Sequence, residues 1–262
     1  MGALWSSKIR DAKEPEVKQG CLMSAYDSTL LSRTDVAAGT MAFRFVKPHD
    51  FVFTAGQYID LTLSGSEPGP SDGLTHTFSI ASSPFDEELV VTTRMRNTAF
   101  KQAISTLPIG GEARIEGPMG SFRLHNNTAR PAVFLAGGIG IAPFLSMLSY
   151  AAGAKLRHPI VLFYANRYLE DAAFMDALWT LERVNPRFRF MPTLTRPPKN
   201  HRGWNGATGH INSEMLLAQV GMLRGPIYYI AGPPTMVEAT RRTLSEVGAD
   251  EDDIRTEEFA GY

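Results

Sequence analysis

An apolar run that leads into a glycine-rich turn and then a helix constrains this chain more than any other feature of its sequence. The segment Ala132-Val-Phe-Leu-Ala-Gly-Gly-Ile-Gly-Ile-Ala-Pro143 places Gly137, Gly138 and Gly140 directly after the run. Glycine lets the backbone approach a ligand closely, and the start of a helix presents unpaired N–H groups and the positive end of its dipole. We therefore predict that the turn binds a pyrophosphate, with Pro143 in the first helical turn.

This turn departs from the usual dinucleotide fingerprint in two ways. The pattern is Gly138-x-Gly140-x-x-Pro143, so a proline stands where the fingerprint has its third glycine. The alternative interpretation of this segment is a tight turn that binds no ligand. No carboxylate follows the next apolar run, which ends at Asn166-Arg167. Arg167, together with Arg196 further along, could instead pair with a 2′-phosphate, which favours NADPH over NADH. Both arginines could equally be solvated surface residues.

The second half of the chain alternates short apolar runs with segments of helical spacing. Alternation of this kind predicts a parallel sheet with helices on both faces. The expected strands are Ala132–Leu135, Ile160–Tyr164, Phe188–Met191, Ile227–Ala231 and Ile254–Phe259. The expected helices begin at Pro143, at about Leu169, after the cap Asn212, and at Pro233.

The first half contains short runs rich in Phe, Val, Ile and Thr between clusters of Gly, Pro, Asp and Ser. This spacing is typical of an antiparallel barrel or sandwich, interrupted here by one helix at about Thr98–Leu107. The polar run His125–Arg130 marks the predicted boundary between an antiparallel domain over 1–125, with its N-terminal residues peripheral, and an α/β domain over 131–262. The expected strands are Met41–Phe45, Tyr58–Leu63, Leu74–Ile80, Glu88–Met95 and Glu112–Glu116.

Composition argues against several classes of function. Lys and Arg number 26 and Asp and Glu 27, which disfavours nucleic-acid binding through bulk positive charge. The single cysteine, Cys21, excludes a cysteine-ligated iron–sulfur site on this chain and fits a reducing, cytoplasmic setting. The six histidines lack metal-ligand spacing, so no metal site is expected. Glycines and a proline interrupt the uncharged stretch Ala132–Ala154, so no transmembrane segment is expected, while Gly2 and Ser6 fit a myristoylation pattern that leaves lipidation open.

Further motifs stand in order with the glycine turn. They are Gly56-Gln-Tyr58, His76-Thr-Phe-Ser79, Gly117-Pro-Met-Gly-Ser-Phe122, Tyr228-Tyr-Ile-Ala-Gly-Pro-Pro-Thr-Met236 and Glu257-Glu-Phe-Ala-Gly-Tyr262. Together these segments resemble the ferredoxin–NADP reductase-like flavoproteins. The resemblance implies an N-terminal FAD-binding antiparallel β-barrel, a C-terminal Rossmann-like sheet that binds NAD(P), and hydride transfer from NAD(P)H to FAD. It also implies that electrons then leave singly to a carrier protein such as ferredoxin or flavodoxin.

The resemblance places the FAD site in the first half of the chain. Phe78 would stack on the flavin and Ser79 would form a hydrogen bond near flavin N5. His76 replaces the family's arginine and is a poorer partner for the FAD pyrophosphate. Lys101 and the N–H groups at the start of the first helix could compensate, although Lys101 could also be an ordinary exposed lysine. The other residues expected at the FAD are Tyr58, Thr77, Thr92, Thr93, Arg94, Thr98 and Phe100.

The resemblance also implies a catalytic set of Ser79, Glu257 and Phe259. Phe259 would cover the flavin and move aside for nicotinamide, and Glu257 would tune the site or relay protons. Ala231 stands where many relatives have a cysteine, so no thiol would assist hydride transfer. The other residues expected at the nicotinamide nucleotide are Gly137, Gly138, Gly140, Pro143, Asn166, Arg167, Thr195, Arg196, Gly232, Pro233 and Met236.

Two other functions remain open on sequence grounds. The chain could be the electron-transfer subunit of a multicomponent oxygenase or dehydrogenase, with any iron–sulfur cluster on a partner. It could also be a redox-inactive nucleotide-binding regulatory module, which the His76 and Ala231 departures allow. The basic loop Arg196–Gly209 would contact cofactor or acceptor, or be a surface excursion. The sequence leaves the oligomeric state, the acceptor and the direction of electron flow open.

Overall fold

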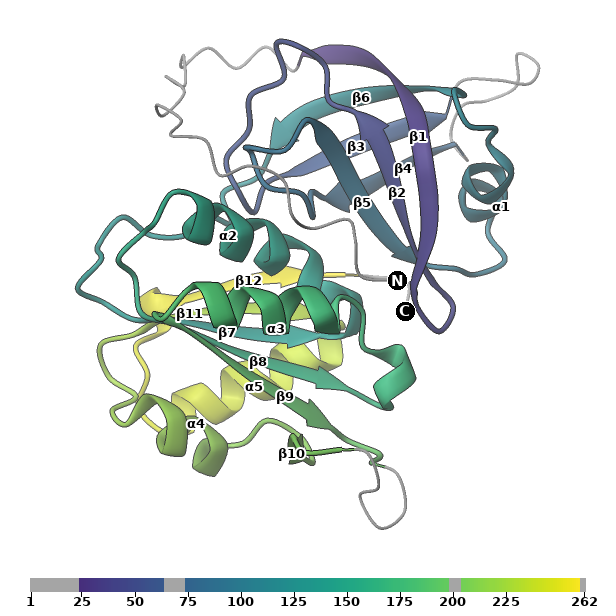
Figure 1. Ribbon diagram of the computed structural model, residues 1–262. Coiled ribbons are helices and arrows are strands. Elements are labelled where there is room, and N and C mark those ends of the chain that lie inside the picture. Colours follow the sequence, from purple (N-terminus) through teal and green to yellow (C-terminus); the bar gives the residue numbers. More distant parts are fainter. Residues whose placement is uncertain (1–23, 64–73, 198–203, 260–262) are drawn as a thin grey trace.

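Two six-stranded sheets, one antiparallel and one parallel, make up the described part of the chain. The structure is a computed structural model and describes residues 24–63, 74–197 and 204–259. Figure 1 shows the antiparallel sheet, drawn in purple and teal, packed over the end of the parallel sheet, drawn in green and yellow. Among the described residues, none of the helices combines the length and apolar character that a membrane crossing requires.

The antiparallel sheet curls into a barrel with its strands in the order β4-β3-β6-β1-β2-β5. Alternate side chains point inward, so Phe43, Phe45, Ile59 and Leu61 are fully buried in one apolar core. A backbone hydrogen bond of 2.8 Å, from the Ala81 N–H to the Val90 carbonyl, lies where the two end strands approach each other. The strands are β1 Ala25–Ala37, β2 Thr40–Val46, β3 Tyr58–Leu63, β4 Thr75–Ser79, β5 Glu88–Arg94 and β6 Glu112–Met119.

Strand β1 is the longest strand of the barrel and was absent from the sequence prediction. Its sequence, Ala-Tyr-Asp-Ser-Thr-Leu-Leu-Ser-Arg-Thr-Asp-Val-Ala, buries only Ser28 and Leu30. Polar residues on the exposed face hide the alternation that identifies a strand. Pairing with both β2 and β6 supplies the backbone partners instead. The expected helix is present as α1, Ala99–Thr106, and Thr98 caps it by accepting a hydrogen bond of 3.4 Å from the Lys101 N–H.

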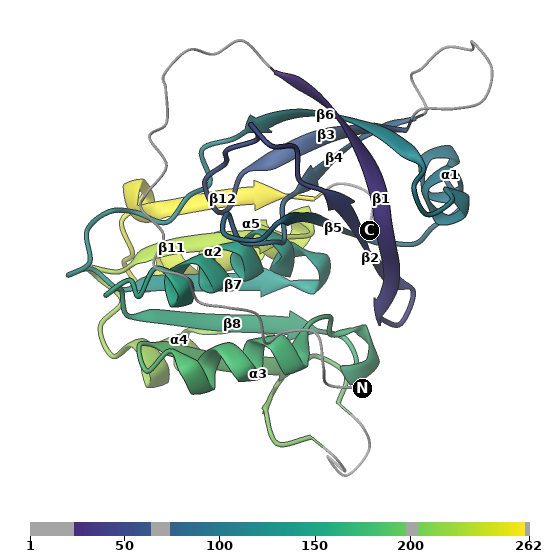
Figure 2. The same ribbon diagram turned by 45° about the horizontal axis from the view of Figure 1, so that its top comes forward.

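The parallel sheet has the strand order β10-β9-β8-β7-β11-β12. Helices α2 and α3 pack on one face through the core that contains Phe134, and α4 and α5 pack on the other through the core that contains Val133 and Leu135 (Figure 2). The strands are β7 Ala132–Gly137, β8 Ile160–Asn166, β9 Phe188–Leu194, β10 Ala207–Thr208, β11 Ile227–Gly232 and β12 Ile254–Glu258. The helices are α2 Ile141–Gly153, α3 Met175–Val184, α4 Ser213–Val220 and α5 Pro234–Glu246. The predicted fold class is therefore confirmed.

Two predicted helix starts were wrong. The segment expected to begin a helix near Leu169 is a short 3₁₀ turn, Leu169–Asp171, and α3 begins only at Met175, after Phe174 with a φ of 62°. Because Phe174 has a left-handed backbone conformation, the chain turns there and the helix cannot extend back through it. The spacing of hydrophobic residues does not reveal such a turn. In the other case the helix begins earlier than expected, because a 3₁₀ turn over Gly138–Gly140 leads directly into α2 at Ile141.

The barrel meets the α/β half through direct contacts between the segment after β4 and helix α2. Ser146 of α2 donates a buried hydrogen bond of 2.6 Å to the Ser82 carbonyl. Phe85 stacks on Tyr150 with ring centroids 5.1 Å apart. This packing brings the edge strands β4 and β5 of the barrel against the glycine turn.

Candidate functional site

A cavity opens where the barrel strands β4 and β5 face the glycine turn. Its walls come from both halves of the molecule, so it exists only once the two halves have packed together. Two of its residues, Ile139 and Ala142, were not among the predicted site residues, although both lie inside the glycine segment. The lining residues are His76, Thr77, Phe78, Ser79, Thr92, Thr93, Arg94, Lys101, Ile139, Ala142 and Phe259.

Aromatic rings form one wall of this cavity. His76 stacks on Phe78 with ring centroids 4.7 Å apart, and Phe100 packs against both rings at 5.4 and 5.5 Å. Burial lowers the pKa of His76, so its imidazole is neutral at neutral pH and offers no charge to a phosphate. The predicted residue Tyr58 lies beside this wall, paired with Ser79 across β3 and β4.

Lys101 is 7% exposed, which overturns its interpretation as an ordinary surface lysine. No carboxylate pairs with its ammonium group among the described residues. Burial lowers the pKa of Lys101, with a further contribution from the positive charge of Arg96. A buried cation without an acidic partner is costly, so the site is suited to an anion such as a diphosphate.

Thr92 indicates that a ligand of this cavity carries a polar atom. Its Oγ1 atom is buried and has no hydrogen-bond partner among the described residues, and the residue lines the cavity. Buried hydroxyl groups are normally paired, so a ligand atom would satisfy this one. Together with the aromatic wall and Lys101, Thr92 makes these residues fit FAD.

Ser79 and Glu257 meet across the junction of the two sheets. The Ser79 hydroxyl donates a hydrogen bond of 3.3 Å to Glu257 Oε2, although the residues are 178 positions apart in sequence. Burial raises the pKa of Glu257 to about 7, and the hydrogen bond from Ser79 opposes that rise. A carboxyl group of this pKa can hold or release a proton near neutral pH.

The glycines of the turn after β7 are closely surrounded by other atoms. A Cβ atom on Gly140 would lie 2.2 Å from the Ala231 carbonyl oxygen, and one on Gly137 would lie 2.4 Å from the sulfur of Met236. Both separations are far inside van der Waals contact. Gly140 therefore serves the close approach of the turn to β11, whether or not the turn also binds a pyrophosphate, whereas Gly137 faces only the side chains of Met236 and Pro233.

The predicted residues for the outer end of the nucleotide lie together at the carboxyl ends of β8 and β9. The Thr195 N–H donates to the Asn166 carbonyl and the Arg196 N–H donates to the Arg167 carbonyl, both at 2.9 Å. Arg167 and Arg196 are exposed. Sequence reasoning missed Tyr168, whose hydroxyl lies 3.4 Å from Arg196 Nη1. Residues 198–203 of the basic loop lie outside the described residues.

Arg94 has a partner that the sequence could not indicate. Its guanidinium donates to Asp171 of the α/β half at 3.2 Å, and Asp171 is only 12% exposed. Beside this ion pair, the Ala38 N–H donates to the Glu170 carbonyl at 2.7 Å. Arg94 thus ties the cavity wall to the parallel half of the molecule.

Comparison with known proteins agrees with this geometry. Residues 134–242 match the family model described as the oxidoreductase NAD-binding domain. The chain is 31% identical over 222 residues to ferredoxin–NADP reductase B of Sorangium cellulosum, covering 80% of this chain and 86% of that protein. It is 28% identical over 243 residues to the phenol hydroxylase P5 protein of Acinetobacter pittii, covering 92% of this chain and 67% of that protein.

Solved structures share the same fold. An Amycolatopsis cytochrome P450 reductase superposes with a TM-score of 0.76 and 24% identity, covering 91% of this chain and 71% of that one. A ferredoxin NADP⁺ reductase from Neisseria gonorrhoeae with bound FAD and NADP superposes with a TM-score of 0.74 and 21% identity, covering 89% of this chain and 98% of that one. The chain therefore belongs to the ferredoxin–NADP reductase-like family and is an FAD-dependent NAD(P)H oxidoreductase.

Proposed function

We propose that the chain accepts a hydride from NADPH in the cavity between β4, β5 and Phe259 and passes single electrons to a ferredoxin, a flavodoxin or a similar carrier protein. The part-buried pair of Ser79 and Glu257 supports this proposal most directly, because it places a titrating carboxyl group beside the cavity. Bound FAD would supply hydride acceptance and one-electron release, since flavins are stable at three oxidation levels.

Different residues of the cavity would bind different parts of FAD. Lys101 and the N–H groups at the start of α1 would hold the diphosphate, and Phe78 and Phe259 would contact the ring system. The Phe259 N–H donates to the Gly232 carbonyl at 3.1 Å, which holds this aromatic residue at the mouth of the cavity. The Thr92 hydroxyl would form a hydrogen bond with a polar atom at the edge of the ring system.

The proton on Glu257 would control the direction of the Ser79 hydroxyl. When Glu257 is ionised, Ser79 donates its hydrogen to the carboxylate. When Glu257 is protonated, it can donate to Ser79 and free the Ser79 hydrogen for a ring nitrogen in the cavity. Because the pKa of Glu257 is about 7, both states are populated near neutral pH.

The preference for NADPH would come from Arg167 and Arg196. Their backbones are joined by a hydrogen bond and both side chains are exposed, so the two guanidinium groups can approach one phosphate. Because solvent screens exposed charges, we expect Arg167→Ala to weaken NADPH binding by about 1 kcal/mol. Binding of NADH, which lacks the 2′-phosphate, should stay unchanged.

The test is stopped-flow reduction of the FAD-loaded protein by NADPH and by NADH. Faster flavin bleaching by NADPH, with a preference that shrinks in Arg167→Ala and Arg196→Ala, is the expected result. An unchanged ratio between the two nucleotides in both variants would refute the assignment. A purified protein that neither carries nor takes up FAD would refute the function itself.

The names of several relatives favour a second kind of electron acceptor, the other components of an oxygenase complex. Chains similar to this one include the reductase component of propane 2-monooxygenase from a Gordonia species, of which this chain spans 61%, and the toluate 1,2-dioxygenase electron transfer component of Pseudomonas putida. The chain could therefore deliver electrons inside an oxygenase complex. Reduction of flavin without transfer to ferredoxin or flavodoxin would favour this role. We also propose a cytoplasmic location, which the single cysteine supports.

A further inference from the structure

A second cleft lies between the two halves of the molecule, at the end of β12 opposite Phe259. Its volume is about 770 Å³, within the range of small-molecule sites. A barrel loop before β3, the connection between the sheets and the first residues of β12 form its walls. None of its residues belongs to the cofactor sites described above. They are Thr54, Ser121, Phe122, Arg123, Leu124, His125, Asn126, Arg255 and Thr256.

The charge of this cleft is positive. Arg123 and Arg255 line it, and none of its lining residues is an aspartate or a glutamate. Neither arginine forms an ion pair with any described residue. By contrast, the neighbouring Arg130 is paired with Asp253. The cleft therefore holds two positive charges that the described residues do not compensate.

Arg255 is fixed in place by neutral groups. Its Nη1 donates to the Arg123 carbonyl at 2.8 Å and to the Tyr229 hydroxyl at 3.1 Å, and its guanidinium carbon lies 5.2 Å from the centre of the Tyr229 ring. These contacts orient the guanidinium without cancelling its charge. A charged donor that is already oriented loses little entropy when an anion binds.

The other side chains of the cleft complete a site for an oxyanion. Thr54, Ser121 and Thr256 carry hydroxyl groups and Asn126 carries an amide, all able to donate to oxygen. His125 adds no charge, because burial lowers its pKa and its ring nitrogens lie 3.0 and 3.1 Å from the Tyr229 hydroxyl and the Arg130 carbonyl.

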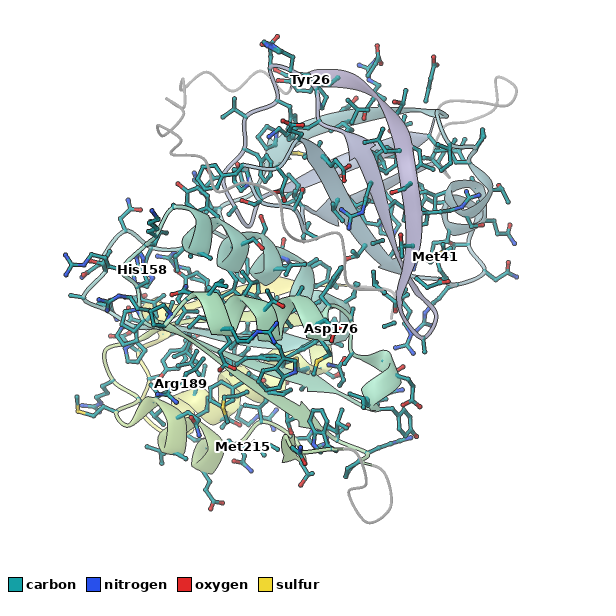
Figure 3. All side chains as sticks on the ribbon, in the orientation of Figure 1. Tyr26, Met41, His158, Asp176, Arg189 and Met215 are labelled. Atoms are coloured by element: carbon teal, nitrogen blue, oxygen red, sulfur yellow. The ribbon has the colours of Figure 1, made fainter. Side chains whose placement is uncertain are left out.

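We propose that this cleft binds a small molecule that carries a phosphate or carboxylate group, with Arg123 and Arg255 on the anion. The ligand would bridge the barrel, the connecting segment and β12. The site is separate from Arg167 and Arg196, which lie at the carboxyl ends of β8 and β9. Figure 3 labels His158, which marks the region of the second cleft because its Nε2 atom lies 2.7 Å from the His125 carbonyl oxygen.

The experiment is isothermal titration of the FAD-loaded protein, saturated with NADP⁺ so that the nucleotide site is filled. Inorganic pyrophosphate and citrate serve as the two probes at constant ionic strength, and they separate phosphate from carboxylate recognition. We expect saturable binding of at least one probe, weakened about tenfold or more by Arg123→Gln, because one charge-assisted hydrogen bond is lost. Arg123 is exposed, so its replacement should not prevent folding.

Arg189→Gln is the matched control, because it removes the same charge from an exposed residue of β9 outside the cleft (Figure 3). Its affinity for the probe should equal that of the unmodified protein. The absence of saturable binding for both probes would overturn the proposal. An equal loss of affinity in Arg123→Gln and Arg189→Gln would also overturn it, because it would show that only the net charge of the surface matters.

Discussion

The barrel side and the sheet side of the cofactor cavity are built by different means. On the barrel side, buried side chains such as Lys101, Phe78 and Thr92 form the wall, and each offers one specific contact. On the sheet side, Ile139, Ala142 and Phe259 line the cavity, and the turn that carries Ile139 packs backbone against backbone, because Gly140 lies against the Ala231 carbonyl of β11. We therefore expect a substitution on the barrel side to remove one contact at a time. On the sheet side, where backbone packs closely on backbone, even one added carbon atom should disturb the structure.

The largest effect is expected from Gly140→Ala. The new methyl group would overlap the Ala231 carbonyl, and because that atom belongs to the backbone of β11, the turn and β11 must move apart. We expect a loss of about 3 kcal/mol in the free energy of unfolding, the upper range for overpacking a core. Urea unfolding followed by circular dichroism measures it. An unchanged unfolding midpoint would show that the two sides of the cavity do not differ in this way.

Glu257→Gln should change the free energy of unfolding by a similar amount, but only at pH values above the pKa of the free carboxyl group. Burial raises the pKa of Glu257 from 4.5 to about 7, so the folded state keeps a proton that the unfolded state releases. The free energy of unfolding should therefore fall as pH rises from about 4.5 to about 7, by about 3 kcal/mol in total, since one pKa unit corresponds to about 1.4 kcal/mol.

Unfolding of the flavin-free protein at pH 5 and pH 8 measures this difference. Glu257→Gln cannot ionise, so its stability should lack this component of the pH dependence. The rate of flavin reduction by NADPH should also change near pH 7 in the unmodified protein and be flatter in the variant. A variant with the same pH profile as the unmodified protein would remove Glu257 from the mechanism.

Lys101→Gln should have the smallest effect of the three and should act on FAD affinity. Loss of one hydrogen bond to a charged group corresponds to about 1.5–3 kcal/mol of binding free energy. Arg157→Gln, which removes a charge from an exposed residue outside the cavity, is the control. Fluorescence titration of the flavin-free protein with FAD gives both values. Equal affinities in the two variants would contradict a direct contact between Lys101 and the diphosphate.

Local features made much of the fold predictable. The alternation of strands and helices in the second half, the glycine turn and the cap at Asn212 each depend on neighbours in sequence, and the structure contains all of them. The predictions failed where local signals were weak or misleading. Strand β1 has a mostly polar face, and Phe174 has a left-handed backbone inside a segment of helical spacing.

The sequence by itself determined the fold class, the order of the elements and the residue types available for cofactor chemistry, because periodicity and glycine placement are local properties of the chain. Only the tertiary structure decided which of these residues meet. Burial of Lys101, the raised pKa of Glu257 beside Ser79 and the ion pair of Arg94 with Asp171 all arise from packing between segments far apart in sequence. Burial and charge pairing depend on distance in space, which neighbouring residues do not encode.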